Sequence, residues 1–243
     1  MIILNNLFGR LGNNIIQLSN IIDISIAYKH NIKINIKFIF FDISVIEKYF
    51  HKYNNSEIIT DKFNFFYKNK LPFPNDIFIQ NIEERNKILQ KAFLINNINK
   101  LPENDLVIHI RSGDIFSSKP HPIYVPPPLS YYTKEIDKYK YEKIHIICED
   151  TINPVVNELL KLYKNAVWEK NNLEKDIRII LGATNIIYSV GTFIPSLMYF
   201  SNNNKYIYGK DCNIEELKEY YKIMKPWKNT IEQRNYILTY DYN

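Results

Sequence analysis

A histidine and an arginine stand two residues apart at the end of an apolar run in the segment LVIHIRSGDIF, residues 106–116. We expect residues 106–110 to form a strand, because the run is rich in β-branched side chains. Alternation along a strand then places Val107, His109 and Arg111 on one face. A guanidinium in that position needs an anionic partner, because a buried charge without one is costly.

Two kinds of anion could meet this arginine. In the first interpretation, Asp114 forms a buried ion pair with Arg111, and His109 is a hydrogen-bonded core residue. In the second, Arg111 binds the phosphate oxygens of a ligand, since a planar guanidinium offers two parallel donors. The ligand would then lie outside the carboxyl ends of the strands, as in other parallel α/β sheets. Gly113 permits a tight turn there, and Asp114 either accepts backbone amides or holds Arg111.

A second polar corner follows a later apolar strand, in IIYSVGTFIPSLMYFS, residues 186–201. Ser189, Gly191 and Thr192 stand between this strand and a helix that has Pro195 in its first turn. Hydroxyls and free amides at the start of a helix form an anion site. The alternative is that Thr192 only caps the helix. Two such corners in one α/β lobe, one of them carrying an arginine, favour a bound diphosphate.

The N-terminal part of the chain predicts a strand, a helix and a second strand. A strand over residues 2–5 is followed by a glycine-containing loop, a helix over 14–29 and a strand over 32–38, which together form a βαβ unit. Residues 42–80 are aromatic and irregular, and a further helix is expected over 82–97.

After residue 100 strands and helices alternate regularly, which predicts a parallel sheet covered on both faces. The segment YYKIMKPW near the C-terminus is expected to be a closing helix packed across the lobes. The fold class is therefore α/β, with two Rossmann-like lobes at residues 1–100 and 101–243. The expected strands are 106–110, 143–148, 166–168, 186–189 and 206–208, and the expected helices end near 139, 162, 182 and 200.

The composition is that of a folded globular protein, with 46% hydrophobic and 23% charged residues. The net charge of +5 suits a phosphate-bearing ligand, a nucleic acid or a membrane surface, but the lysines are scattered along the chain, which is equally typical of an ordinary solubilising surface. Nucleic-acid binding rests only on this charge and the aromatic content, because no known module's pattern occurs. Cys148 and Cys212 belong to no CxxC, which indicates a reducing compartment. Because we find neither a membrane span nor a signal peptide, we expect a cytoplasmic protein.

Three short motifs, in this order, resemble the fucosyltransferase superfamily. They are FGRLGNNIIQLSN at residues 8–20, His-x-Arg-x-Gly-Asp at 109–114 and Ser-x-Gly-Thr-Phe at 189–193. The pattern most resembles the α1,2-fucosyltransferases of glycosyltransferase family 11, and it is similar to the α1,6-fucosyltransferases and protein O-fucosyltransferases. Two positions depart from the family: Asn14 replaces a glutamine, and Ser112 stands where many relatives carry a second basic residue.

The resemblance implies a GT-B architecture with a reduced N-terminal lobe, in which GDP-fucose binds mainly to the C-terminal lobe and the acceptor enters between the lobes. Arg111 would hold the β-phosphate and stabilise the departing GDP, and Asp176 would lie near the base. Arg10 would face the donor from the other lobe. The matched donor-binding residues are His109, Arg111, Gly113, Asp176, Ser189, Gly191, Thr192, Phe193 and Asn13, and the catalytic candidates are Arg111, Asp114 and Arg10.

We therefore expect inverting, metal-independent transfer of fucose from GDP-fucose to a glycan hydroxyl, with no cofactor besides the donor. Negative charge develops on the leaving diphosphate, and a preorganised arginine is well suited to stabilise it. The sequence contains no Asp-x-Asp pair, which the other common architecture uses to hold a divalent cation. Asp114 and Asp23 are candidates for the general base. The alternatives are the same architecture with another nucleotide sugar, or a non-catalytic nucleotide or glycan binder.

Overall fold

The computed structural model of the chain describes residues 1–53, 57–209 and 215–241. Cys148 is buried, and Cys212 lies outside the described residues. Among the described helices, none combines the length and the apolar character that a membrane crossing requires.

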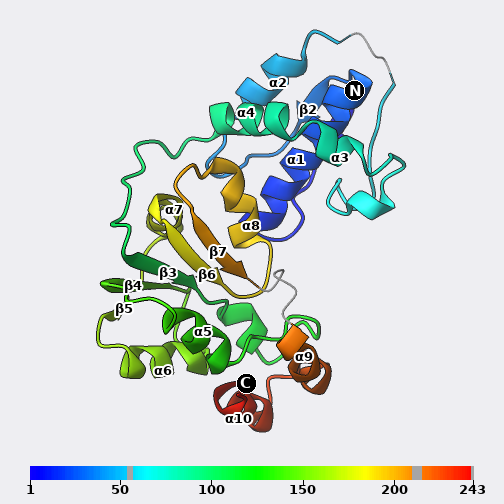
Figure 1. Cartoon of the computed structure of the whole chain (residues 1–243). Coiled ribbons are helices and arrows are strands. Elements are labelled where there is room, and N and C mark those ends of the chain that lie inside the picture. Colours follow the sequence, from blue (N-terminus) through cyan, green and yellow to red (C-terminus); the bar gives the residue numbers. More distant parts are fainter. Residues whose placement is uncertain (54–56, 210–214, 242–243) are drawn as a thin grey trace. The chain divides into compact units, whose positions relative to one another are not determined.

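The chain forms two compact units (Figure 1). Unit 1 comprises residues 1–97 and 192–201, and unit 2 comprises residues 98–191 and 202–243. The expected division between residues 100 and 101 differs from these units at residues 98–100, which belong to unit 2, and at residues 192–201, which we expected in the C-terminal lobe. This segment belongs to unit 1 because its helix packs along the first helix of the chain.

Unit 2 is built on a five-stranded parallel sheet with the strand order β5-β4-β3-β6-β7. From β3 the chain runs outward through β4 to β5, and then returns to the other side of β3 with β6 and β7. The order thus reverses between β3 and β6, the position where open α/β sheets bind ligands. The strands are β3 (Asp105–His109), β4 (Lys143–Ile147), β5 (Ala166–Trp168), β6 (Asn185–Tyr188) and β7 (Tyr206–Gly209).

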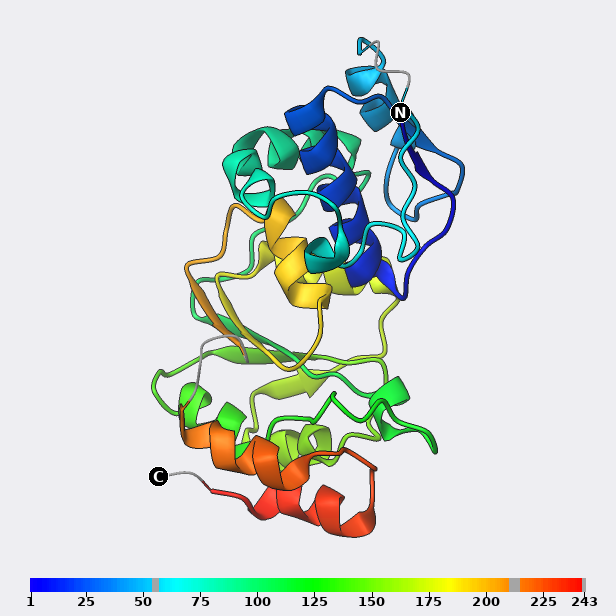
Figure 2. The ribbon, with the colours of Figure 1, turned by 90° about the vertical axis from the view of Figure 1, so that its right-hand side faces the viewer.

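Helices cover both faces of this sheet. On one face lie α5 (Leu129–Ile136) and α6 (Pro154–Leu162), and on the other lies α7 (Leu173–Gly182). Beyond α5 and α6 follow α9 (Lys218–Met224) and α10 (Ile231–Thr239), which form a further layer (Figure 2). The predicted parallel sheet with helices on both faces is confirmed.

The C-terminal segment completes the core of unit 2. Tyr220, Met224 and Trp227 are buried in the same apolar cluster as the inner faces of α5 and α6. The Tyr220 hydroxyl donates to the carbonyl of Pro126 at 2.8 Å, and Trp227 Nε1 donates to the carbonyl of Ile115 at 2.6 Å. We expected this segment to pack across the lobes, but its large apolar side chains are buried within one unit.

Unit 1 contains the predicted βαβ unit. The strands β1 (Ile2–Leu4) and β2 (Ile32–Ile34) pair in parallel, and α1 (Leu11–Tyr28) connects them. The helix begins three residues earlier than the expected Asn14, so the glycine-containing motif forms its first turn. Beside α1 lies α8 (Phe193–Leu197), which comes from the far end of the sequence (Figure 1).

The prediction that residues 42–80 are irregular is wrong at both ends. That range contains α2 (Ile43–Phe50) and α3 (Ile77–Gln80), and α4 (Ile82–Ala92) follows. Asp42 begins α2, because its Oδ1 accepts the N–H of Ser44 at 3.1 Å and so satisfies a free amide of the first turn.

Buried polar side chains line one face of α1. Gln17, Asn20 and Asp23 recur at intervals of three and have no exposed surface. Gln17 Nε2 donates to the carbonyl of Asn64 at 2.8 Å, and Asn20 Nδ2 donates to the carbonyl of Phe65 at 2.7 Å. These amides therefore supply partners for the backbone of a loop that has no strand or helix to satisfy it.

Asp23 forms a buried ion pair at the end of this polar face. Its Oδ2 lies 2.9 Å from Arg85 Nη1, and both side chains are at most 4% exposed. Burial raises the pKa of Asp23 to about 6, and the guanidinium of Arg85 opposes that rise. The ring of Tyr199 lies over the guanidinium, 4.9 Å from ring centre to Cζ. Asp23 is thus unsuited to be the general base, because it is buried and paired.

Replacing Arg85 should expose the cost of this buried carboxylate. We expect Arg85→Ala to lower the free energy of unfolding by about 3–5 kcal/mol at pH 8, because it leaves Asp23 charged and unpaired. Loss of the cation raises the pKa of Asp23 further, and below that pKa the protonated carboxyl carries no charge. The loss measured by chemical denaturation should therefore be smaller at pH 5.

Arg178→Ala is the matched control, because Arg178 pairs with Glu174 on the surface of α7, with side chains 38% and 49% exposed. We expect it to cost less than about 1 kcal/mol. An Arg85→Ala loss as small as that of Arg178→Ala would contradict the prediction.

Candidate functional site

Arg111 lies just beyond the carboxyl end of β3, where the strand order reverses. Its backbone N–H donates to Ser189 Oγ at 2.8 Å, and its carbonyl accepts a hydrogen bond from Asn153 Nδ2 at 3.0 Å. Ser189 directly follows β6, and Asn153 directly precedes α6. The main chain of Arg111 is therefore fixed from both sides by neighbouring elements of the same sheet.

The guanidinium of Arg111 forms a bidentate ion pair with Asp114. Arg111 Nε lies 3.2 Å from Asp114 Oδ1, and Nη2 lies 2.7 Å from Oδ2. The arginine side chain is only 14% exposed, whereas that of Asp114 is 49% exposed. The ring of Tyr124 lies 4.1 Å from the guanidinium carbon, which adds a cation–π contact. The ion pair of the first interpretation is therefore present, and its outer partner faces solvent.

Gly191 lies beside the third nitrogen of the same guanidinium. Its φ of +109° is a backbone conformation that residues with a side chain rarely adopt. A Cβ at this position would lie 2.8 Å from Arg111 Nη1. Any larger residue would therefore push the guanidinium away from the end of β6.

Two residues outside the three motifs support the turn after β3. Ser112 Oγ donates to Asp150 Oδ1 and accepts the N–H of Asn153 at 3.1 Å. Asn153 also caps α6, where its Oδ1 accepts the N–H of Val155 at 3.1 Å. Reasoning from the motifs missed Asn153, although Asn followed by Pro is typical of a helix start.

Other predicted donor-binding residues of unit 2 lie along the same edge. Ser189 is buried, and its hydroxyl accepts from the backbone of Arg111. We therefore assign Ser189 to positioning this arginine, although we expected it to contact the diphosphate. His109 is the last residue of β3, and its carbonyl accepts the N–H of Ser189 at 3.0 Å. Gly113 begins the following turn with a φ of +54°.

Asp176 stands in the first turn of α7 and is half-buried. Its Oδ1 accepts a hydrogen bond from Asn171 Nδ2 at 3.1 Å, and burial raises the pKa of its carboxyl. Burial also raises the pKa of the Cys148 thiol to about 12, with further contributions from the negative charges of Asp150 and Asp176. Asp176 stands in the helix that follows β5, and its carboxylate therefore belongs to the carboxyl edge of the sheet.

The remaining predicted residues lie in unit 1. Thr192 Oγ1 donates to Asn13 Oδ1 at 2.6 Å. Thr192 occupies the N-cap position of α8, but its side chain makes no capping hydrogen bond. We expected Thr192 and Phe193 in the C-terminal lobe and Asn13 in the other, whereas all three belong to unit 1. Arg10 is the exposed N-cap residue of α1.

The start of α8 differs in two respects from the helix start that we expected to bind an anion. The helix has only five residues and continues as a 3-10 helix, η3 (Met198–Phe200). So short a helix has little accumulated dipole. The hydroxyl of Thr192 is engaged with α1, so this corner holds two helices together.

Gly12 makes that contact between α1 and α8 possible. A Cβ at Gly12 would lie 2.8 Å from the backbone nitrogen of Phe193 and 2.8 Å from the carbonyl carbon of Thr192. The second glycine of the N-terminal motif is therefore required for close approach of the two helices.

Another pair of titratable groups in unit 2 lies at the opposite edge of the sheet. His145 Nε2, from the middle of β4, lies 3.0 Å from Oδ2 of Asp105, the first residue of β3, and Arg111 lies beyond the other end of that strand. In the part of the chain that the structure describes, no group of three or more His, Cys, Asp or Glu side chains is placed to hold a metal ion.

Comparisons with known proteins support the fold. No family model and no curated protein sequence matches the chain. Among solved structures, it resembles POFUT1 in complex with GDP, with a TM-score of 0.51 and 11% identity over 86% of this chain and 97% of the other. POFUT1 in complex with GDP-fucose gives 0.50 and 10% over the same shares. The predicted α/β fold is thereby confirmed, and this chain shares it with the POFUT1 structures.

Gly12→Ala tests the close approach of α1 and α8, because the variant should lower the free energy of unfolding if the helices are in contact and raise it if they are not. In an unobstructed helix, alanine in place of glycine would raise the free energy of unfolding by up to about 1 kcal/mol. Here the added methyl group must push α8 away, so we expect a loss of about 1–3 kcal/mol in chemical denaturation. A stabilised variant would show that the backbones of Gly12 and Phe193 do not approach as described.

Proposed function

We propose that this protein is a fucosyltransferase, which transfers fucose from GDP-fucose to a hydroxyl of a glycan without a metal ion. The observation that carries the proposal is Arg111, held with little exposure at the point of strand reversal in a fold shared with POFUT1. The POFUT1 structures hold GDP and GDP-fucose, which supports a nucleotide-sugar donor here.

Arg111 would bind the diphosphate of the donor. When the bond to the sugar breaks, negative charge grows on the leaving GDP, and a guanidinium fixed beforehand stabilises that charge without reorganising. Asp114 occupies Nε and Nη2, whereas Nη1 has no hydrogen-bond partner among the described residues and lies beside Gly191. We therefore assign Nη1 to a phosphate oxygen and Asp114 to holding the guanidinium in place.

Asp176 would select the base of the donor. Guanine presents two neighbouring N–H groups, at N1 and at the exocyclic N2, and a carboxylate can accept both. Uracil and thymine present one N–H between two carbonyls, which a carboxylate matches less well. The position of Asp176 in the first turn of α7, the helix after β5, supports this role, because β5 and β3 are parallel and their carboxyl ends lie at the same edge of the sheet.

Arg111→Ala should abolish transfer without unfolding the protein. Removing one charge-stabilising donor typically costs about 10²–10³ in rate, and we expect at least that loss in GDP release from GDP-fucose. Arg111→Lys should recover little, because an ammonium cannot bind Asp114 and phosphate with separate nitrogens. Arg178→Ala, which removes an exposed arginine of the same unit, is the control. Normal turnover by Arg111→Ala would refute the role of Arg111.

The nucleobase of the donor can be identified by thermal denaturation of the protein with GDP, UDP and dTDP. A ligand at 100 times its Kd stabilises the folded state by about 2.7 kcal/mol, so the matching nucleotide should raise the Tm clearly. We expect GDP to do so, and Asp176→Ala to reduce the shift for GDP more than for UDP. A larger shift with UDP or dTDP would instead favour another nucleotide sugar as the donor.

A further inference from the structure

A second concave site lies in unit 2, at the edge of the sheet opposite Arg111. It is a surface pocket of about 390 Å³, formed by the loop between α5 and β4 and by the segment between α6 and β5. Its volume falls within the range of about 300–1,000 Å³ that is typical of small-molecule sites. Ile136 and Ile144 supply its apolar floor, and Tyr139, Tyr141 and Tyr163 supply aromatic walls.

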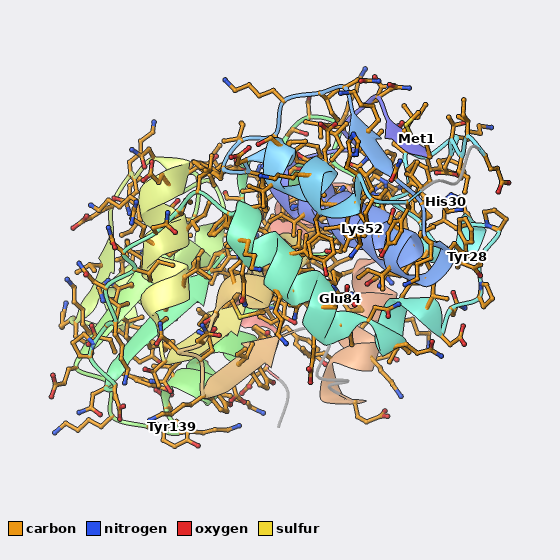
Figure 3. All side chains as sticks on the ribbon, turned by 90° about the horizontal axis from the view of Figure 1, so that it is seen from above. Met1, Tyr28, His30, Lys52, Glu84 and Tyr139 are labelled. Carbon is orange, nitrogen blue, oxygen red and sulfur yellow. The ribbon has the colours of Figure 1, made fainter. Side chains whose placement is uncertain are left out.

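Tyr139 offers an open aromatic face. Its side chain is 58% exposed and stands at the outer surface of unit 2 (Figure 3). The ring meets Tyr141 and Tyr206 edge to face, with centroids 6.1 Å and 6.0 Å away. These contacts support the ring from the side, so its orientation is set before any ligand binds.

Hydrogen bonds order the loop that carries Tyr139. The Tyr163 hydroxyl donates to Asp137 Oδ1 at 2.7 Å, and Asn165 Nδ2 donates to the carbonyl of Tyr141 at 2.9 Å. Among the described residues, nothing donates to Asp137 Oδ2 or to Asn165 Oδ1. The pocket therefore presents two fixed acceptors beside its tyrosine rings.

The polar groups of the pocket carry little net charge. Lys138 is paired with Glu135, and the other two charged residues that line the pocket, Asp137 and Lys140, have opposite signs. Burial raises the pKa of the Tyr141 hydroxyl to about 12, so it remains a hydrogen-bond donor at neutral pH. This balance disfavours a phosphate or another strongly charged ligand and favours a neutral molecule with many hydroxyls.

We propose that this pocket binds a neutral sugar ring of the glycan acceptor, remote from the hydroxyl that reacts. A pyranose has an apolar C–H face that can stack on Tyr139 and hydroxyls that can donate to Asp137 and Asn165. The identification of the sugar as part of an acceptor rests on the proposed function. A weak second contact of this kind raises the overall affinity for a long glycan, because the second binding event is intramolecular.

Binding is tested without donor, by saturation-transfer difference NMR with glucose, N-acetylglucosamine, lactose and cellobiose. We expect at least one sugar to bind with a Kd of about 1–10 mM. Tyr139→Ala should lower the affinity for that sugar at least about fivefold through loss of stacking, whereas Tyr139→Phe should retain the affinity. Tyr28→Ala, which removes a 39% exposed tyrosine of unit 1, is the matched control.

Two results would overturn the proposal. One is the absence of binding by all four sugars up to about 50 mM, and the other is equal affinity in the wild type and in Tyr139→Ala. Thermal denaturation verifies that Tyr139→Ala is folded. Measurement of GDP-fucose turnover separates the two proposals, because sugar binding at Tyr139 in a protein without turnover would uphold the pocket and refute the transferase.

Discussion

The guanidinium of Arg111 has little exposure at the carboxyl edge of a parallel sheet, and the residues around it are those that stabilise a charge in such a position. A cation removed from water is stable only beside an anion. Asp114 supplies the anion, Tyr124 covers one face and Gly191 leaves room beside Nη1. Ser189 and Asn153 fix the main chain. A site organised in this way can meet a phosphate without rearranging its backbone.

In unit 1 the first helix has two tasks, because it hydrogen-bonds the backbone of a loop and also packs against another helix. Gln17 and Asn20 use their buried amides to satisfy a loop without regular structure. At the start of the same helix, Gly12 brings the backbone of α8 into contact, and Asn13 accepts the hydroxyl of Thr192. The N-terminal motif therefore has a packing role in addition to any contact with a donor.

The residues of the Ser-x-Gly-Thr-Phe motif belong to both units and have different roles in each. Ser189 and Gly191 belong to unit 2 and act on Arg111, whereas Thr192 and Phe193 belong to unit 1 and act on α1. A motif read along the sequence looks like one corner of one site. The structure shows that neighbouring residues can satisfy separate requirements when the chain passes from one unit to the next.

The sequence by itself determined the α/β class and the parallel sheet of unit 2, because hydrophobic periodicity is a local property. It also singled out Arg111 as a charge that needs an anionic partner. It left open whether that partner is Asp114 or a phosphate-bearing ligand, and the structure contains the pair with Asp114. Only the tertiary structure decided that Asn153 holds Arg111, that Asp23 is buried against Arg85 and that residues 192–201 join unit 1. Those contacts join segments far apart in the chain, and local patterns carry no information about which distant backbone a side chain will meet.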